Sequence, residues 1–152
     1  MNPPSLSTLS LSLEQGIAEI RLNRPDKSNA MNDAMWQEIR QAFDWVDATP
    51  EARVAILSGA GRNFCAGIDL TLLAGIQQRI AHPDAARSRE ALRRLILDLQ
   101  DCLSSVERCR KPVLAAIQGA CIGGALDLVT NCDMRDAAAD AVFSVREIDL
   151  GM

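Results

Sequence analysis

The sequence has few groups that could hold a metal. Its 152 residues include one histidine, His82, and none of the five cysteines forms a C-x-x-C pair. Structural zinc sites are built from such pairs together with histidines, so we expect no metal. The cysteines are odd in number and have small or apolar neighbours, which predicts reduced, mostly buried thiols.

Basic residues and long apolar runs are also scarce. Sixteen Lys and Arg stand against 20 Asp and Glu, which gives a net charge of −4. Nucleic-acid binding depends on clustered cations, so this balance argues against a nucleic-acid partner. No apolar run approaches the roughly 18 residues of a membrane span, and no basic segment followed by an apolar one opens the chain. These absences predict a cytoplasmic protein with no membrane partner.

The residues that are present suffice for one core, since 48% of them are hydrophobic. Residues 1–8 are rich in Pro and Ser and predict a disordered tail. The alternating pattern of Leu9–Leu22 predicts a β-hairpin. Two short apolar runs, Val54–Ser58 and Val113–Ile117, predict buried strands.

Helical periodicity lies between these strands. Asn32 or Asp33 is a suitable N-cap for a helix that ends near Thr49. Helices are also predicted over 69–80, after Gly124 and over 85–108; the apolar stripe of the last is Leu92, Leu95, Ile96, Leu99, Leu103 and Val106. Extended pieces are expected near 133–135 and 142–145. Strands that alternate with helices predict an α/β architecture.

Both strands end in small-residue loops that lead into helices. Gly119 and the pair Gly123-Gly124 follow strand 113–117, and Gly59 to Leu70 follows strand 54–58. Such turns bring backbone N–H groups close to a ligand and point them at negative charge. N–H groups from two loops could therefore converge on one oxygen.

Carboxylates accompany these loops. Asp127 lies in the first turn of the helix after Gly124, and Glu147 follows 20 positions later. N–H donors aimed at an oxyanion, with a carboxylate close by, are the parts needed for proton chemistry next to a carbonyl.

Plainer interpretations exist for each feature. Small residues also allow strands and helices to pack closely, and isolated acids are commonly solvated or cap helices. Asp69 either caps its helix or helps to seat a ligand. Lys27 and Arg62 are candidate contacts for phosphates or ordinary solvated charges. Gly59-Ala-Gly61 lacks the third glycine of a dinucleotide loop.

Four motifs follow one another along the chain: Leu22-Asn-Arg-Pro25 with Asn29-Ala-Met31, Phe64-Cys-Ala-Gly-Ile-Asp-Leu70, Lys111-Pro-Val113 through Gly124, and Cys132-Asp133. In this order and spacing the chain resembles the crotonase superfamily, the enoyl-CoA hydratase/isomerase family. The resemblance implies a spiral of repeated β-β-α units, of which residues 9–152 form the N-terminal core, truncated before the C-terminal helical region. It also implies an acyl-CoA substrate, no cofactor apart from the coenzyme A of that substrate, and a homo-oligomer, trimer or hexamer, in full-length relatives.

Four segments resemble the Δ3,5-Δ2,4-dienoyl-CoA isomerase subgroup. They are Gly67-Ile-Asp-Leu70, Cys121-Ile-Gly-Gly124, Leu126-Asp-Leu-Val-Thr130 and Val145-Arg-Glu-Ile-Asp149. The resemblance implies isomerisation of 3,5-dienoyl-CoA to 2,4-dienoyl-CoA in fatty-acid β-oxidation. The site residues that it implies are the backbone N–H groups of Ala66 and Gly124 as oxyanion hole, Asp127 and Glu147 as catalytic acids, and Ala66, Gly67, Ile68, Asp69 and Gly123 for substrate binding.

In that subgroup the counterpart of Glu147 takes a proton from C2, and a further Asp, which aligns beyond Met152, returns one at C6. We therefore expect the 152 residues alone to be nearly inactive. Two other functions stay open. One is an enoyl-CoA hydratase, which a Glu at position 127 would have favoured. The other is a catalytically inactive fragment of the family.

Overall fold

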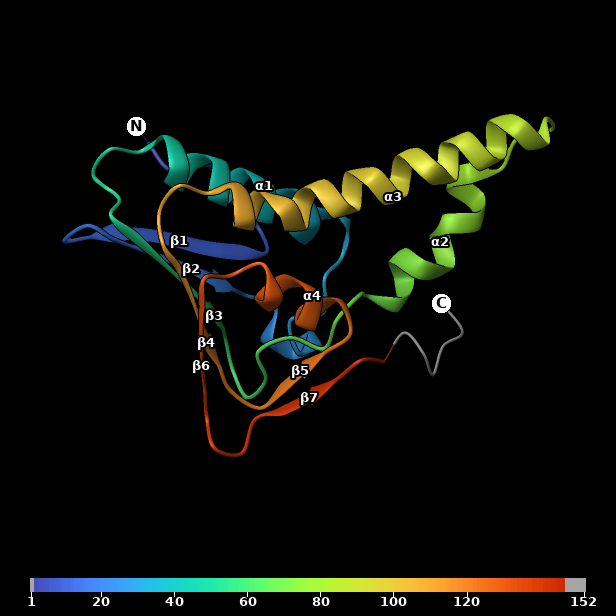
Figure 1. The fold of residues 1–152 in the computed structure, drawn as a ribbon. Coiled ribbons are helices and arrows are strands. Elements are labelled where there is room, and N and C mark those ends of the chain that lie inside the picture. Colours follow the sequence, from blue (N-terminus) through green and yellow to red (C-terminus); the bar gives the residue numbers. More distant parts are fainter. Residues whose placement is uncertain (1, 147–152) are drawn as a thin grey trace.

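The N-terminal hairpin begins a five-stranded sheet. The computed structural model describes residues 2–146. β1 (Leu9–Glu14) pairs antiparallel with β2 (Ile17–Leu22), and β3 (Val54–Gly59), β4 (Val113–Ile117) and β6 (Met134–Ala137) follow in parallel, in the order β1-β2-β3-β4-β6. Parallel neighbours need crossover connections, and each crossover in this sheet contains a helix (Figure 1).

The helices agree closely with the periodicity of the sequence. They are α1 (Asp33–Ala48), α2 (Leu70–Ile80), α3 (Ala85–Arg108) and α4 (Gly124–Thr130). A short 3₁₀ turn, η1 (Pro25–Lys27), precedes α1.

A second, smaller layer completes each crossover. β5 (Ala120–Ile122) and β7 (Val142–Ser144) pair in parallel, and single bridges join Cys65 to Cys121 and Met31 to Ile68. Each turn of the chain therefore adds a strand to the large sheet, an extended piece to the small layer, and helix (Figure 1). This arrangement confirms the predicted spiral of β-β-α units.

Helix α1 covers one face of the sheet and supplies much of the core. Asn32 caps it as predicted, because its Oδ1 accepts the Met35 N–H at 3.0 Å. Ile39 and Phe43 are fully buried in the same cluster as Ile20 of β2. Burying side chains of this size contributes about 1.5–3 kcal/mol each.

Helices α2 and α3 form a hairpin whose tip projects beyond the sheet (Figure 1). Within α3 only Cys102, Ser105 and Val106 are buried, all in its C-terminal half. Ile96, expected on the apolar stripe, is 45% exposed, because that part of α3 extends past the sheet. Within residues 2–146, no helix has both the length and the apolar character to cross a membrane.

The chain before β1 is anchored by a buried carboxylate. Glu38 of α1 is 8% exposed. Its Oε1 accepts the N–H and the hydroxyl of Ser7 at 2.8 and 2.6 Å, and its Oε2 accepts the same groups of Thr8 at 2.8 and 2.6 Å. Because a buried carboxylate needs hydrogen-bond donors, Ser7 and Thr8 are held beside Glu38. The predicted disorder of residues 1–8 therefore does not hold for Ser7 and Thr8.

Hydrogen bonding sets the charge of Glu38. Burial alone would raise the pKa of this carboxyl, but the hydrogen bonds from Ser7 and Thr8 hold it below its ordinary value of 4.5. A carboxylate with a lowered pKa stabilises the fold above the unfolded-state pKa, and this contribution is lost as the pH falls through the folded-state value.

We expect Glu38→Gln to lower the free energy of unfolding by about 2–4 kcal/mol near neutral pH, since it removes a charge and one acceptor oxygen. The difference from the wild type should shrink as the pH falls below 4.5. Urea unfolding over a pH series measures it, with the exposed Glu51→Gln as control. A difference independent of pH would contradict this account.

Candidate active site

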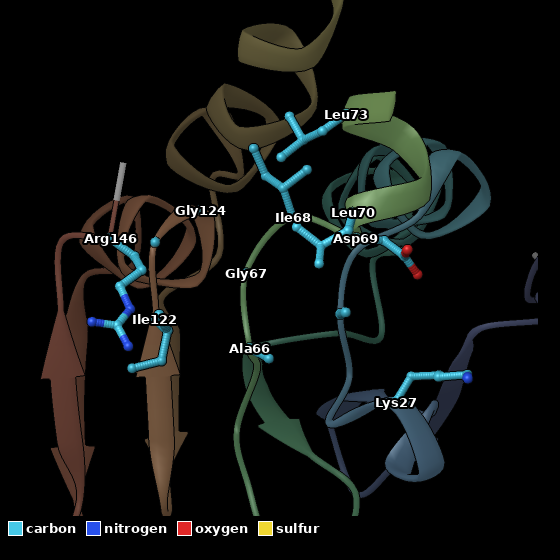
Figure 2. Close-up of a pocket in the computed structure, with 12 residues that line it drawn as sticks. Lys27, Ala66, Gly67, Ile68, Asp69, Leu70, Leu73, Ile122, Gly124 and Arg146 are labelled. Atoms are coloured by element: carbon cyan, nitrogen blue, oxygen red, sulfur yellow. The ribbon is translucent and has the colours of Figure 1, made fainter. Parts of the chain in front are cut away.

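A pocket of about 450 Å³ opens where the two glycine loops meet the start of α2. Residues 66–70 form one wall and 122–124 the other, and Leu73 of α2 lines the pocket on the side of Ile68 (Figure 2). The two loops that the sequence singled out therefore line one cavity.

Backbone pairing holds these loops against each other. The Cys65 N–H donates to Ala120 O at 3.0 Å, and the Ile122 N–H donates back to Cys65 O at 3.1 Å. Gly67 has φ +91°, and a Cβ at this position would lie 2.6 Å from Ile122 O and 3.5 Å from Gly124 N. Only glycine fits such a close approach of two backbones.

The amide of Ala66 does not face this pocket. Its N–H donates to Ser28 O at 2.9 Å, which contradicts the prediction that Ala66 supplies an N–H to a ligand oxygen. The backbone groups on either side of the Ile68 amide both pair with Met31. Gly67 O accepts the Met31 N–H at 2.8 Å, and the Asp69 N–H donates to Met31 O at 3.0 Å.

The amide of Ile68 lies between those two groups. In extended backbone successive N–H groups point to opposite sides, so the Ile68 N–H is directed away from Met31. Among residues 2–146 it has no hydrogen-bond partner, and Ile68 lines the pocket. The sequence alone does not indicate Ile68 over Ala66, because the free amide is decided by the pairing of its neighbours with residues 28–31.

Gly124, the other predicted N–H donor, also lines the pocket. It is the first residue of α4, where helix N–H groups lack intrahelical partners, and within the described residues its N–H has none. A Cβ on Gly124 would lie 3.2 Å from Cγ1 of Ile68. Two amides without a partner among residues 2–146 thus come from neighbouring positions on two loops of one pocket.

Asp69 acts as a helix cap. Its carboxylate accepts the Thr71 N–H at 3.0 Å and hydroxyl at 2.7 Å, and it pairs with Arg24 at 2.9 Å. The hydrogen bonds from Thr71, and then that from Arg24, lower the pKa of Asp69 to about 2. The capping interpretation is therefore confirmed, and Asp69 lines the pocket as a fixed anion.

The two predicted catalytic acids are not placed at the pocket by the described residues. Asp127 is exposed in the first turn of α4, and it is not one of the pocket's lining residues. Glu147 lies outside the described residues. The catalytic roles of both stay predictions.

Two cations flank the pocket. Arg146 lies beside Ile122 on one side and Lys27 on the other (Figure 2). Lys27 was a candidate phosphate contact, whereas Arg62, the other candidate, does not line the pocket. Arg146 was not singled out from the sequence, although it directly precedes Glu147 in the matched segment.

The thiols belong to the core. All five cysteines are buried and free, as expected, and burial raises the pKa of Cys65 to about 12. Within residues 2–146, no group of three His, Cys, Asp or Glu side chains is placed to hold a metal ion.

Together, the spiral of β-β-α units and the pocket between its glycine loops define a crotonase-type α/β protein. The structure superposes on an enoyl-CoA hydratase/isomerase from Xanthobacter autotrophicus Py2 with a TM-score of 0.84 and 34% identity, over 97% of this chain and 52% of the other. Residues 12–152 match the sequence profile of the enoyl-CoA hydratase/isomerase family, and the chain therefore belongs to this family.

Dienoyl-CoA isomerases are among its relatives. A peroxisomal Δ3,5-Δ2,4-dienoyl-CoA isomerase from Arabidopsis thaliana is 42% identical over 97% of this chain and 54% of its own. The mitochondrial Δ3,5-Δ2,4-dienoyl-CoA isomerase of Homo sapiens is 43% identical over 93% and 43%. A Mycobacterium tuberculosis protein named "Probable enoyl-CoA hydratase" is 35% identical over 93% and 51%. The chain thus spans about half the length of these relatives. The two isomerases are named for organelles, whereas the sequence alone predicted a cytoplasmic location.

We expect Gly67→Ala to lower the free energy of unfolding by about 2 kcal/mol or more, because a side chain at φ +91° is strained and its Cβ meets Ile122 O. Gly75→Ala, inside α2 with no atom within 4 Å of the new Cβ, should instead raise it by about 0.5–1 kcal/mol. Urea unfolding of both variants tests the close approach of the loops, and equal effects would argue against it.

Proposed function

We propose that this chain forms the thioester site of an acyl-CoA isomerase that converts 3,5-dienoyl-CoA to 2,4-dienoyl-CoA. The observation that carries the proposal is a pair of amides, Ile68 and Gly124, on adjacent loops of one pocket, both without a hydrogen-bond partner within residues 2–146. Relatives named dienoyl-CoA isomerases support the reaction class.

The chemistry follows from the charge that forms on the thioester oxygen. When a base removes a proton from C2, the C–H electron pair forms a C1–C2 double bond and the carbonyl electrons move onto the thioester oxygen, which gives a dienolate. As the carbonyl re-forms, the electrons form the C2–C3 double bond, the C3–C4 and C5–C6 double bonds are replaced by one at C4–C5, and C6 takes up a proton. The intermediate carries negative charge on the thioester oxygen. Two fixed N–H donors stabilise that charge, and loss of one such donor typically costs 10²–10³-fold in turnover.

We assign the acid–base steps to the carboxylates that the resemblance implies. Glu147 is the C2 base. Asp127 polarises the dienyl group, and a further acid, expected in the part of the relatives that this chain does not span, returns the proton at C6. Carboxylates that share an apolar pocket raise one another's pKa, which suits proton transfer near neutral pH.

The remaining features support a coenzyme A ligand. Lys27 and Arg146 place positive charge at two sides of an otherwise largely apolar pocket, and coenzyme A carries phosphates. No cofactor beyond that ligand is needed. A homo-oligomer and a β-oxidation compartment accord with the family.

The second candidate function is hydration of a 2-enoyl-CoA. The similarity to the M. tuberculosis protein favours it, whereas Asp127 does not. An Asp is one methylene shorter than the Glu usual in hydratases, so it would hold an attacking water differently.

The test is turnover of 3,5-dienoyl-CoA, followed by the ultraviolet band of the conjugated product, against hydration of 2-enoyl-CoA. The chain should be assayed alone and fused to the second half of the Arabidopsis relative. We expect the chain alone to turn over 3,5-dienoyl-CoA slowly and the fusion to isomerise it. In the fusion, Glu147→Gln should lower the isomerisation rate about 10²–10⁴-fold, and the exposed Asp140→Asn should leave it unchanged. Faster hydration than isomerisation would contradict the proposal. A fusion that binds both thioesters and converts neither would favour the inactive alternative.

A further inference from the structure

One buried side chain organises the loop that carries Ile68. Asn29 is fully buried. Its Nδ2 donates to three carbonyl oxygens, those of Ala60 at 2.8 Å, Asn63 at 3.0 Å and Phe64 at 3.0 Å. Its Oδ1 accepts the Arg24 N–H at 2.9 Å. Every polar atom of this side chain is therefore engaged, and the three carbonyls all belong to the segment that leads into the pocket wall.

The backbone on either side of Asn29 continues the same contact. Asn29 O accepts the Cys65 thiol at 3.0 Å, Ser28 O accepts the Ala66 N–H, and Met31 pairs with Gly67 O and the Asp69 N–H. Residues 28–31 thus bond the Phe64 and Gly67 carbonyls and the Ala66 and Asp69 N–H groups. The Ile68 N–H has no partner among the residues that the structure describes, and its direction is fixed by the pairing of its neighbours.

We propose that Asn29 is a positioning residue that fixes the Ile68 N–H toward the thioester oxygen. The inference rests on the proposed function for its ligand but on the hydrogen bonds above for its geometry. Asn29 does not itself line the pocket, so it acts through residues 60–68. Without its amide, three carbonyls would lose a buried donor, and the loop would have to move to regain hydrogen bonds to water.

Asparagine meets two requirements at this position. The backbone has φ 55°, a left-handed conformation that Asn and Gly adopt more readily than most residues. The carbonyls need a donor, which Gly lacks. Asn29→Gly therefore keeps the backbone conformation and removes only the amide, whereas Asn29→Ser retains one hydroxyl donor.

The 152-residue chain, at 16.5 kDa, is suited to assigned amide NMR spectra. The first arm compares octanoyl-CoA, which has a thioester carbonyl, with the S-octyl thioether of coenzyme A, which has none. In the wild type the amide protons of Ile68 and Gly124 should move downfield with the thioester only. In Asn29→Gly we expect the Ile68 shift to be lost, the Gly124 shift to stay, and the thioester affinity to fall about tenfold. Asn29→Ser should be intermediate.

The second arm needs no ligand. Hydrogen exchange of the Ala66 and Asp69 amides should accelerate at least about tenfold in Asn29→Gly, with β2 and β3 unchanged. Asn32→Asp, which keeps the acceptor that caps α1, is the control and should alter neither readout.

The two arms separate the two proposals. A wild type that does not distinguish thioester from thioether overturns the proposed function, and the exchange rates then still decide the role of Asn29. If the wild type does distinguish them and both Asn29 variants retain the full Ile68 shift and the wild-type exchange rates, the positioning role is wrong. If Asn29→Gly does not fold, Asn29→Ser provides the same two readouts.

Discussion

A loop that runs through the interior must find a partner for each backbone N–H and C=O, because an unpaired buried group costs about 1–3 kcal/mol. In this protein the side-chain amide of Asn29 meets that requirement for three carbonyls of the segment between β3 and α2, those of Ala60, Asn63 and Phe64. The position of Ile68 and the N-cap of α2 at Asp69 depend on the path that this segment takes.

The candidate site consists of backbone N–H groups that have no hydrogen-bond partner within residues 2–146. The carbonyl of Gly67 and the N–H of Asp69 are both bonded to Met31, so the Ile68 N–H between them faces the other way. On the adjacent loop the Gly124 N–H has no partner in the described part of the chain, because a helix cannot satisfy its first amides. Rigid surroundings then matter as much as the donors, because donors that are already oriented need no reorganisation when charge develops.

Much of this fold could be predicted from the sequence, because hydrophobic periodicity and helix caps depend only on residues close together in the chain. The hairpin, the cap at Asn32 and the bounds of α3 agree with the pattern. β5 was not indicated, since its three residues lie between Gly119 and Gly123, which both have positive φ. The anchoring of the first residues by Glu38 is a contact about 30 positions apart, and no local pattern reports it.

The sequence predicted which two loops form the candidate site, but not which amide of the first loop stays free. Two glycine turns after parallel strands must meet at one edge of a sheet, so their convergence followed from the sequence. Which N–H remains free depends on the partners of each neighbour, and these lie in residues 28–31.

The most direct test of the two-amide site is a crystal structure of the protein with a bound acyl-CoA thioester. The account predicts its carbonyl oxygen within about 3 Å of both Ile68 N and Gly124 N; a carbonyl bound away from these two amides would contradict it.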